Sequence, residues 1–204
     1  NSKFDSNRTI NLSKYYSNQI DQNIKDKKFN FIITNDPTLV AYVKSKISII
    51  IWTDATFKGY FNLYFKDKKI NKETIRQGKI IEKKAFLKSR FVCFSSKWAL
   101  KSAVNSYPNL KKKFRIIKYG SNFSFEPHKK NIFKSISIKK KNLNKLNFIS
   151  VGVDWNRKGM SKALKLINYL NFKGIKSKLT IVGSKPKNSN LDVKNTKIIE
   201  FLDK

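Results

Sequence analysis

Cysteine, histidine, proline and glycine are all scarce in this sequence. The 204 residues include one cysteine, one histidine, four prolines and seven glycines. The single cysteine, Cys93, excludes an internal disulfide, and its place in the apolar run RFVCF predicts a buried free thiol in a reducing compartment. The single histidine, His128, lies beside Pro127 and two lysines and is expected in a solvated loop. Because His, Cys and Asp do not cluster at metal-ligand spacing, the sequence predicts no metal site.

Long hydrophobic runs and the common nucleotide-binding fingerprints are missing as well. Apolar runs such as ISIII have the length of a strand, and no run approaches the length of a membrane-spanning helix. Neither G-x-G-x-x-G nor the P-loop pattern occurs, which leaves dinucleotide binding and P-loop chemistry without support. Hydrophobic residues make up 40% of the chain and aromatic residues 13%, which is enough for a core and argues against disorder.

Acidic residues are few and lysine is abundant. The chain has 45 Lys+Arg against 13 Asp+Glu, a formal net charge of +32, which by itself favours a polyanionic partner. However, arginine, the preferred reader of phosphates and base edges, is rare, and the lysines are spread along the whole chain. Abundant Lys, Asn, Ile and Phe are typical of AT-rich coding sequences. The sequence therefore favours compositional bias first, an anionic membrane surface second and nucleic acid last. The arginines are Arg8, Arg76, Arg90, Arg115 and Arg157.

Short apolar runs alternate with helix-length amphipathic stretches, which predicts an α/β fold with mostly parallel sheets. The continuously apolar run SIIIW suits a strand that is covered on both faces. Asn71 is the expected N-cap of one helix, and Ser95 or Ser96 that of another, which ends before Pro108. In this first half, strands are expected at 29–35, 48–57, 90–96 and 114–123, and helices at 38–44, 71–89 and 97–107.

The segment 126–145 is polar, lysine-rich and without periodicity, and it is predicted to be a linker. It separates an N-terminal domain, 1–125, from the start of a C-terminal domain, 146–204. In the latter, strands are expected at 146–152, 177–183 and 196–204, with a helix at 160–172 that ends before Gly174. Strand, helix and strand in this order predict a right-handed βαβ unit at the start of a second parallel sheet.

The turn VGVDWNRKGM joins the first strand of that unit to its helix. Gly152 is at the carboxyl end of the strand, which is the edge where open α/β sheets bind ligands. Free N–H groups at the helix N-terminus favour a phosphate there, and Arg157 and Lys158 would add cationic donors. The alternative is that Gly152 only permits the turn and that both basic side chains are solvated.

The segment ISVGVDWNRKGMSKALKLINYLNFKGIKSKLTIVGSKP resembles the start of the donor-binding domain of family 4 glycosyltransferases, which are retaining enzymes of GT-B architecture. In the first half, WTDATF, FVCFSSKWALKSAV and FRIIKYGSNF resemble the end of the family's N-terminal domain. There Glu82 corresponds to a glutamate on a helix that precedes a strand ending in serine, and Gly120 to Asn122 correspond to the turn at the domain junction. In the second half, the matching elements are Val151-Gly152, Lys158-Gly159, the helix from Met160, Val182-Gly183 and Phe201.

This resemblance implies two Rossmann-like domains, both incomplete in this chain. It also implies transfer of a sugar, with retention, from a nucleotide-sugar donor to a glycan or lipid-linked acceptor in cell-surface glycan biosynthesis. The donor is a substrate, and no cofactor is implied. Gly152, Arg157, Lys158 and Gly183 would bind the donor. The arginine that usually follows the glycine in this family is Val153 here, so Arg157 is the candidate to replace it.

The family's catalytic histidine is not matched in this chain. Asp54 stands at the corresponding place, either as acceptor contact or base, or only as a residue that caps a turn. The family's Glu-x7-Glu is expected beyond Lys204, so this chain alone is expected not to turn over substrate. The resemblance further implies a cytoplasmic location, with at most peripheral contact with an anionic membrane. The residues leave open a non-catalytic basic module that binds anionic lipid or nucleic acid, and another GT-B enzyme such as a sugar-nucleotide epimerase.

Overall fold

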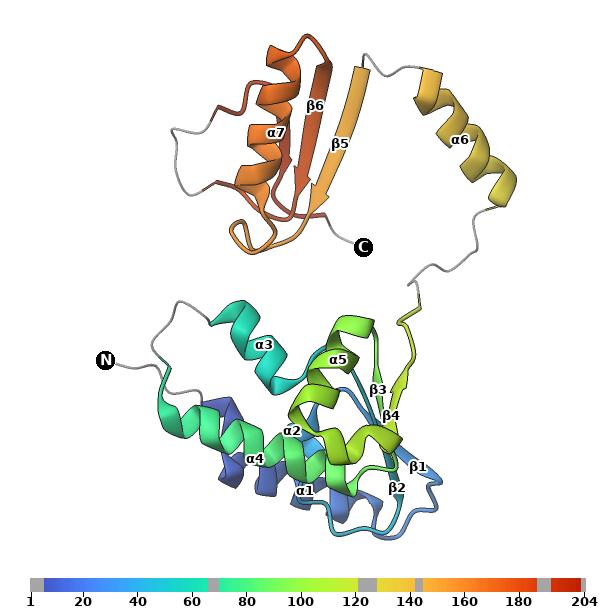
Figure 1. The fold of residues 1–204 in the computed structure, drawn as a ribbon, viewed down its shortest axis with the longest axis vertical. Helices are drawn as coiled ribbons and strands as arrows, with labels where there is room; N and C mark the ends of the chain where they lie inside the picture. The colour runs from blue at the N-terminus through green and yellow to red at the C-terminus, as the bar shows by residue number, and fades with distance from the viewer. Residues whose placement is uncertain (1–5, 66–69, 121–127, 142–144, 187–191, 203–204) are drawn as a thin grey trace. The chain divides into compact units, whose positions relative to one another are not determined.

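The computed structural model describes residues 6–65, 70–120, 128–141, 145–186 and 192–202. The chain divides into two compact units, Asn1–Asn122 and Phe123–Lys204. Each unit contains a purely parallel sheet (Figure 1). The predicted α/β class with parallel sheets is thereby confirmed.

The first unit has a four-stranded parallel sheet in the order β1-β2-β3-β4. Its strands are β1 (Phe31–Thr34), β2 (Ser48–Thr53), β3 (Phe91–Phe94) and β4 (Phe114–Ile116). Its helices are η1 (Ser6–Arg8), α1 (Ile10–Ile24), α2 (Pro37–Val40), α3 (Phe57–Tyr64), α4 (Lys72–Lys88), α5 (Lys97–Ser106) and η2 (Pro108–Lys113). The predicted caps are confirmed, because Asn71 accepts a hydrogen bond from the Glu73 amide at 2.8 Å and Ser96 accepts one from Ala99 at 3.2 Å.

Two helices of this unit, α1 and α3, were not predicted from the sequence. The face of α1 that packs inward carries the buried serines Ser13 and Ser17. Their hydroxyls donate to the carbonyl oxygens of Thr38 at 2.6 Å and Leu39 at 2.9 Å. Because hydrogen bonds to α2 replace part of the usual apolar stripe, hydrophobic periodicity gives no clear signal for α1.

The core of the first unit lies on one face of the sheet. Phe86 on α4 is completely buried and packs edge-to-face on Phe94, Phe114 and Tyr107, with ring centroids 5.4 to 6.1 Å apart. The same buried cluster also contains Val40, Ala41, Val43, Ile49, Ile51, Ile81, Ala85, Val92, Ala99 and Ala103. The strand residues of this cluster, Ile49, Ile51 and Val92, point to the same face of the sheet, because side chains alternate between the two faces along each strand. The helices that form this core therefore cover a single face.

The opposite face of this sheet is apolar and incompletely covered. Ile50 and Trp52 on β2 are only half-buried, and Phe31 and Ile33 on β1 are 52% and 65% exposed. The prediction that β2 is covered on both faces is therefore wrong for the described part of the chain. Continuous apolarity was a correct sign of a central strand, but it did not reveal that the second face has no covering layer there.

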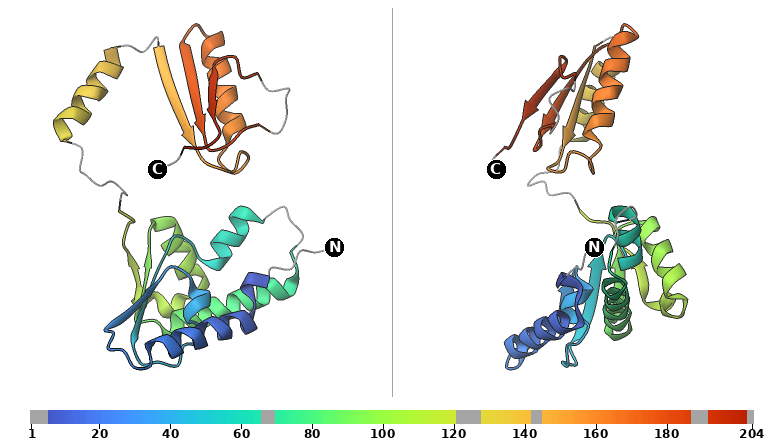
Figure 2. Two further views of the ribbon diagram at one scale, coloured as in Figure 1. Left: turned by 180° about the vertical axis from the view of Figure 1, so that it is seen from behind. Right: turned by 90° about the vertical axis from the view of Figure 1, so that its left-hand side faces the viewer.

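The second unit contains β5 (Lys145–Val151), β6 (Lys176–Val182) and β7 (Thr196–Ile199), in the order β5-β6-β7. Helix α7 (Met160–Phe172) has the predicted bounds and covers one face of this sheet (Figure 2). Its residues Met160, Leu164 and Ile167 pack on Leu179 and Ile181. Beyond the helix, Gly174 has φ 79°, which is the left-handed conformation expected of a helix terminator.

The segment 126–145, which was predicted to be a linker from its lack of periodicity, contains a helix, α6 (Lys129–Lys141). Its apolar residues, Ile132, Phe133 and Ile136, have helical spacing, but the surrounding lysines obscured that periodicity in the sequence. None of the helices in the described ranges has both the length and the hydropathy that a bilayer span requires.

Replacing Phe86 by alanine is expected to destabilise the first unit by about 3 to 5 kcal/mol, because its ring is buried among three other aromatic rings. Leu87→Ala is the matched control, since Leu87 is 53% exposed, and a change within about 0.5 kcal/mol is expected. Urea unfolding followed by circular dichroism measures both. Equal losses for the two variants would contradict the assigned core.

Candidate functional site

Polar residues of the first unit gather at the carboxyl ends of β1 and β2. They border a pocket with a volume of about 350 Å³. Asp36 accepts a hydrogen bond from the Thr38 amide at 2.8 Å and so caps α2, and Thr56 caps α3 through the Gly59 amide at 3.0 Å. The pocket is lined by Arg8, Asn35, Asp36, Pro37, Thr38, Thr53, Asp54, Ala55, Thr56, Phe57, Tyr60, Leu63, Tyr64, Gly78, Ile81, Glu82 and Trp98.

Asp54, the candidate acceptor contact, follows β2 directly and lines this pocket. Its side chain is exposed and accepts no hydrogen bond from any residue that the structure describes. It differs in this respect from Asp36, whose carboxylate is used in a helix cap. The Asp54 carboxylate is therefore available to a ligand, and within the described ranges it caps no turn.

Glu82 on α4 lies beneath the pocket and is almost completely buried, with 3% of its surface exposed. Its Oε1 accepts a hydrogen bond from the Phe57 amide at 2.5 Å, and its Oε2 accepts one from the Tyr107 hydroxyl at 2.7 Å. Burial raises the pKa of Glu82 to about 7, although both hydrogen bonds and the charge of Arg8 oppose the shift. The same burial, with the nearby carboxylate, raises the pKa of Tyr107.

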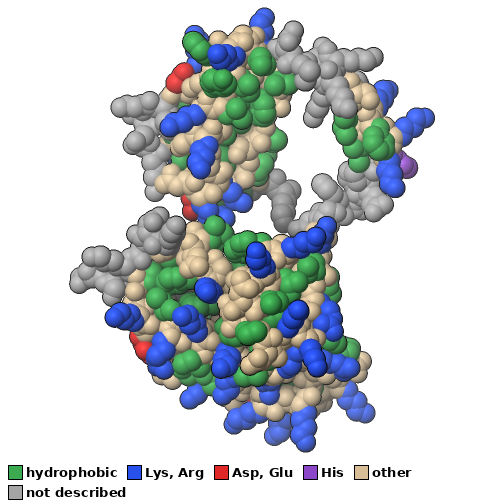
Figure 3. Space-filling model, in the orientation of Figure 1, with side chains coloured by type: hydrophobic (Ala, Val, Ile, Leu, Met, Phe, Trp, Pro, Cys, Tyr) green, Lys and Arg blue, Asp and Glu red, His purple; other side chains and the backbone are tan. Residues whose placement is uncertain are grey.

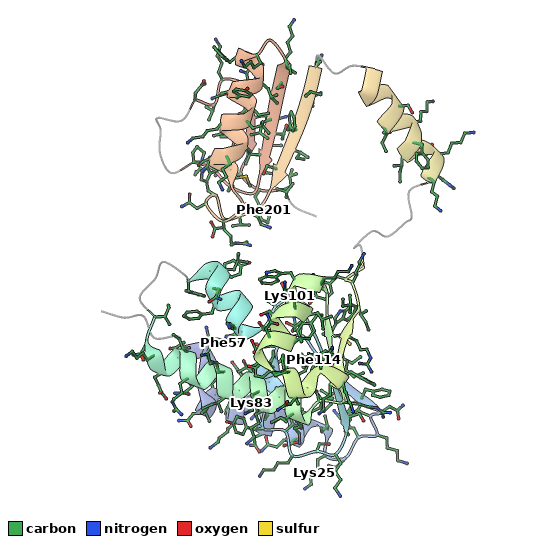
Figure 4. All side chains as sticks on the ribbon, in the orientation of Figure 1. Lys25, Phe57, Lys83, Lys101, Phe114 and Phe201 are labelled. Carbon is green, nitrogen blue, oxygen red and sulfur yellow. The ribbon has the colours of Figure 1, made fainter. Side chains whose placement is uncertain are left out.

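Phe57, at the start of α3 and labelled in Figure 4, lines the pocket, and its ring lies next to Gly78 of α4. A Cβ atom at Gly78 would lie 2.4 Å from this ring, so the glycine is what allows α4 to approach it. On the pocket side, the Arg8 guanidinium lies 5.7 Å from the centroid of Phe57 and 5.5 Å from that of Tyr60. A cation over two rings is favourable, and it brings a positive charge to the pocket wall.

The chain that leads to the predicted domain junction is fixed against the end of β2. The Trp52 indole donates to the carbonyl oxygen of Ile117 at 2.8 Å, and the ring centroids of Trp52 and Tyr119 are 5.2 Å apart. Burial raises the pKa of Tyr119, and the negative charge of Asp54 raises it further. Gly120 has open space around it, whereas Asn122 lies outside the described residues, so no geometry supports a role for it.

In the second unit, three of the four predicted donor-binding residues meet where β5 and β6 end. The Gly152 amide donates to Val182 and the Gly183 amide to Ile199, both at 2.9 Å. A Cβ atom at Gly183 would lie 3.2 Å from the backbone of Gly152, and one at Gly152 would lie 2.5 Å from Cγ of Lys158. The absence of a side chain at Gly152 thus leaves room for the Lys158 stem, and its absence at Gly183 lets the two strand ends approach each other.

The loop between Gly152 and α7 is held by its own residues. Asp154 accepts hydrogen bonds from the Arg157 amide through its side chain at 3.0 Å and from the Lys158 amide through its carbonyl at 2.9 Å. Its carboxylate also lies 3.8 Å from the Arg157 guanidinium. Trp155 is buried against α7 and donates its indole N–H to the Ser161 hydroxyl at 2.8 Å. The two residues of this turn that had no assigned role, Asp154 and Trp155, therefore shape and anchor it.

The free N–H groups expected at the start of α7 are largely occupied. Gly159, with φ 70°, places its carbonyl so that it accepts from both Lys162 and Ala163, at 2.9 and 3.1 Å. The Met160 amide donates to Trp155 at 3.1 Å. An anion at this edge would therefore depend on the Lys158 ammonium group rather than on those amides. Lys158 is exposed and forms no ion pair with any described residue.

Comparisons with known proteins do not assign this chain to a family. No family model matches the chain, and no curated protein matches it. Among the residues that the structure describes, no three His, Cys, Asp or Glu side chains are grouped so that they could hold a metal ion. The two sites thus rest on the arrangement of their own side chains.

Replacing Glu82 by glutamine is expected to remove a pH dependence of stability. The pKa of the folded state, about 7, lies above the ordinary 4.5. The stability that protonated Glu82 contributes is therefore complete below pH 4.5 and is lost as the pH rises through 7. The amide keeps both hydrogen-bond partners, so between about pH 5 and pH 8 the wild type should lose on the order of 2 kcal/mol more stability than Glu82→Gln.

Urea unfolding at several pH values measures this difference. Glu73→Gln is the control, because the pKa of Glu73 is lowered to about 2, so this half-buried carboxylate does not titrate in this range. Parallel pH profiles for wild type and Glu82→Gln would contradict the assignment.

Replacing Gly183 by alanine is expected to destabilise the second unit by about 1 to 2 kcal/mol, because its φ of 93° is unfavourable for a residue with a Cβ atom. The added methyl group would also press on Gly152. Gly120→Ala is the control, since that site is open, and it should be neutral. Thermal unfolding measures both. An unchanged midpoint for Gly183→Ala would show that the strand ends do not need this conformation.

Proposed function

We propose that this chain is part of a retaining glycosyltransferase of GT-B architecture that transfers a sugar from a nucleotide-sugar donor to a glycan or lipid-linked acceptor. The observation that carries the proposal is the meeting of Gly152, Lys158 and Gly183 at the carboxyl edge of the second sheet. This is the edge at which open α/β sheets bind ligands. Its order of residues is the one that resembles the donor-binding turn of family 4 enzymes.

The donor diphosphate would lie beside Lys158 in this proposal. When the bond between the sugar and the diphosphate breaks, negative charge grows on the leaving phosphate while the sugar becomes oxocarbenium-like. An ammonium group placed there binds the diphosphate in the ground state and stabilises the added charge further as the bond breaks, so it supports both affinity and rate. Gly152 contributes by leaving room for the stem of Lys158 beside it, and Gly183 by letting the ends of β5 and β6 approach each other.

Arg157 is the second cationic candidate at the donor end. Its contact with Asp154, at 3.8 Å with both side chains largely exposed, is of the kind that contributes little to stability. Val153, which stands where the family has arginine, is 77% exposed and provides no charge, so Lys158 and Arg157 would together supply what that arginine supplies elsewhere.

The acceptor would bind in the pocket of the first unit. A volume of about 350 Å³ is at the lower end of the range for small-molecule sites. The aromatic rings of Tyr60 and Trp98 line it beside the Asp54 carboxylate. Such rings pack against the C–H faces of a sugar, and a carboxylate accepts hydrogen bonds from its hydroxyl groups. In the proposal Asp54 orients the attacking hydroxyl or receives its proton, and the cytoplasm, where nucleotide sugars are found, is the location.

Calorimetric titration of the protein with UDP-, GDP- and ADP-sugars tests the donor site. We expect one nucleotide series to bind and Lys158→Ala to weaken that binding by about tenfold or more, because a hydrogen bond to a charged group is lost. Lys162→Ala is the matched control, since Lys162 is an exposed lysine on the first turn of α7, and its affinity should stay within about twofold.

Two results would count against the proposal. One is an affinity for nucleotide sugars that Lys158→Ala leaves unchanged. The other is salt-dependent binding to duplex DNA with no binding of any nucleotide sugar, which would favour a non-catalytic basic module instead.

A further inference from the structure

Helix α6 exposes apolar side chains that no part of the described structure covers. Ile132, Phe133 and Ile136 are 42%, 66% and 44% exposed. Every residue from Lys129 to Ser137 is exposed, so α6 buries no described side chain in a core. Figure 3 shows these green apolar atoms with blue lysine side chains around them.

The arrangement along α6 is amphipathic. Ile132, Phe133 and Ile136 have spacings of one and four residues and so share one side of the helix. Lys129 lies within the angular range of this stripe and Lys130 at its border, whereas Lys134 lies across the helix from it. The sequence of α6, KKNIFKSISIKKK, has six lysines and no acidic residue. A helix of 13 residues is marginal in water by itself and gains most of its stability when an apolar face packs against another surface.

Charge disfavours two of the surfaces that could cover this stripe. A surface of this chain would offer few carboxylates to the lysines next to the stripe, since the chain has only 13 acidic residues against 45 basic ones. A second copy of the chain carries a net charge of +32 and would repel the first. The complementary surface is therefore both anionic and able to accept large apolar side chains.

A membrane of anionic lipids has both properties, whereas duplex nucleic acid has only the first. Protein groups that bind the phosphate backbone of a duplex are charged or polar, so exposed Ile132, Phe133 and Ile136 would gain nothing there. At a bilayer surface, such side chains enter the boundary between headgroups and acyl chains while lysines contact anionic headgroups. The stems of Lys129 and Lys130 are long enough to keep their ammonium groups at the interface beside the buried stripe.

We propose that α6 binds flat on the surface of an anionic lipid membrane, with Ile132, Phe133 and Ile136 inserted and the lysines on the headgroups. This contact does not depend on the glycosyltransferase proposal. It would hold the second unit beside the membrane on which a lipid-linked molecule resides, and it needs no membrane-spanning helix.

Vesicle flotation with the full chain tests this contact. The vesicles contain phosphatidylcholine alone or with about 30% phosphatidylglycerol, a share that gives a clearly negative surface. We expect binding only to the anionic vesicles. The triple variant Ile132→Ser, Phe133→Ser, Ile136→Ser keeps every charge. Its affinity for the anionic vesicles should be lower by about tenfold or more. Because these side chains are exposed, circular dichroism should show an unchanged fold.

A matched control removes apolar side chains elsewhere in the same unit. Leu166 and Phe172 on α7 are 47% and 81% exposed, and the variant Leu166→Ser, Phe172→Ser should bind like the wild type. As a second measurement, Phe133→Trp should give a blue-shifted tryptophan emission with anionic vesicles, after subtraction of the wild-type signal. Equal binding by the wild type and the triple variant would overturn the proposal, as would an equal loss in the control or an unshifted Phe133→Trp emission.

Discussion

The buried carboxyl group of Glu82 joins the helices that border the pocket of the first unit. It accepts the first amide of α3 and the hydroxyl of Tyr107, which follows α5, while its own helix, α4, carries the core residues Ile81, Ala85 and Phe86. A carboxyl group in this position is costly to ionise, yet it satisfies two donors at once. The hydrogen bond to the Phe57 amide fixes the start of α3, the helix that carries the pocket residue Tyr60.

The candidate sites of both units follow from one property of parallel sheets. All strand carboxyl ends lie at the same edge, so residues distant in sequence come together there. In the first unit this edge gathers Asp36 and Asp54, and in the second it gathers Gly152 and Gly183. The parallel pairing of the strands sets where these residues lie, and the loops that follow the strands supply the polar side chains.

Much of this arrangement could be predicted from the sequence. Apolar periodicity located the strands and α7, and the polar caps located α4 and α5, because these signals are local. The proximity of Gly152 and Gly183 followed from parallel pairing. The roles of Glu82 and Trp155 could not be predicted, since each depends on what tertiary packing brings to a side chain. Helix α1 was missed because serine hydroxyls form part of its packing face, and α6 because lysines mask its apolar residues.

The incompletely covered face of the first sheet has a consequence for how this chain behaves in solution. Phe31 and Ile33 are on β1, which is also an edge strand of the described sheet, so an exposed apolar surface and a strand edge without a described neighbour coincide. What keeps two such surfaces apart is the repulsion between molecules of charge +32. Salt shortens the reach of that repulsion, to about 10 Å at 0.1 M, and leaves the apolar attraction intact. We therefore expect this chain to associate through that face more readily as the salt concentration rises.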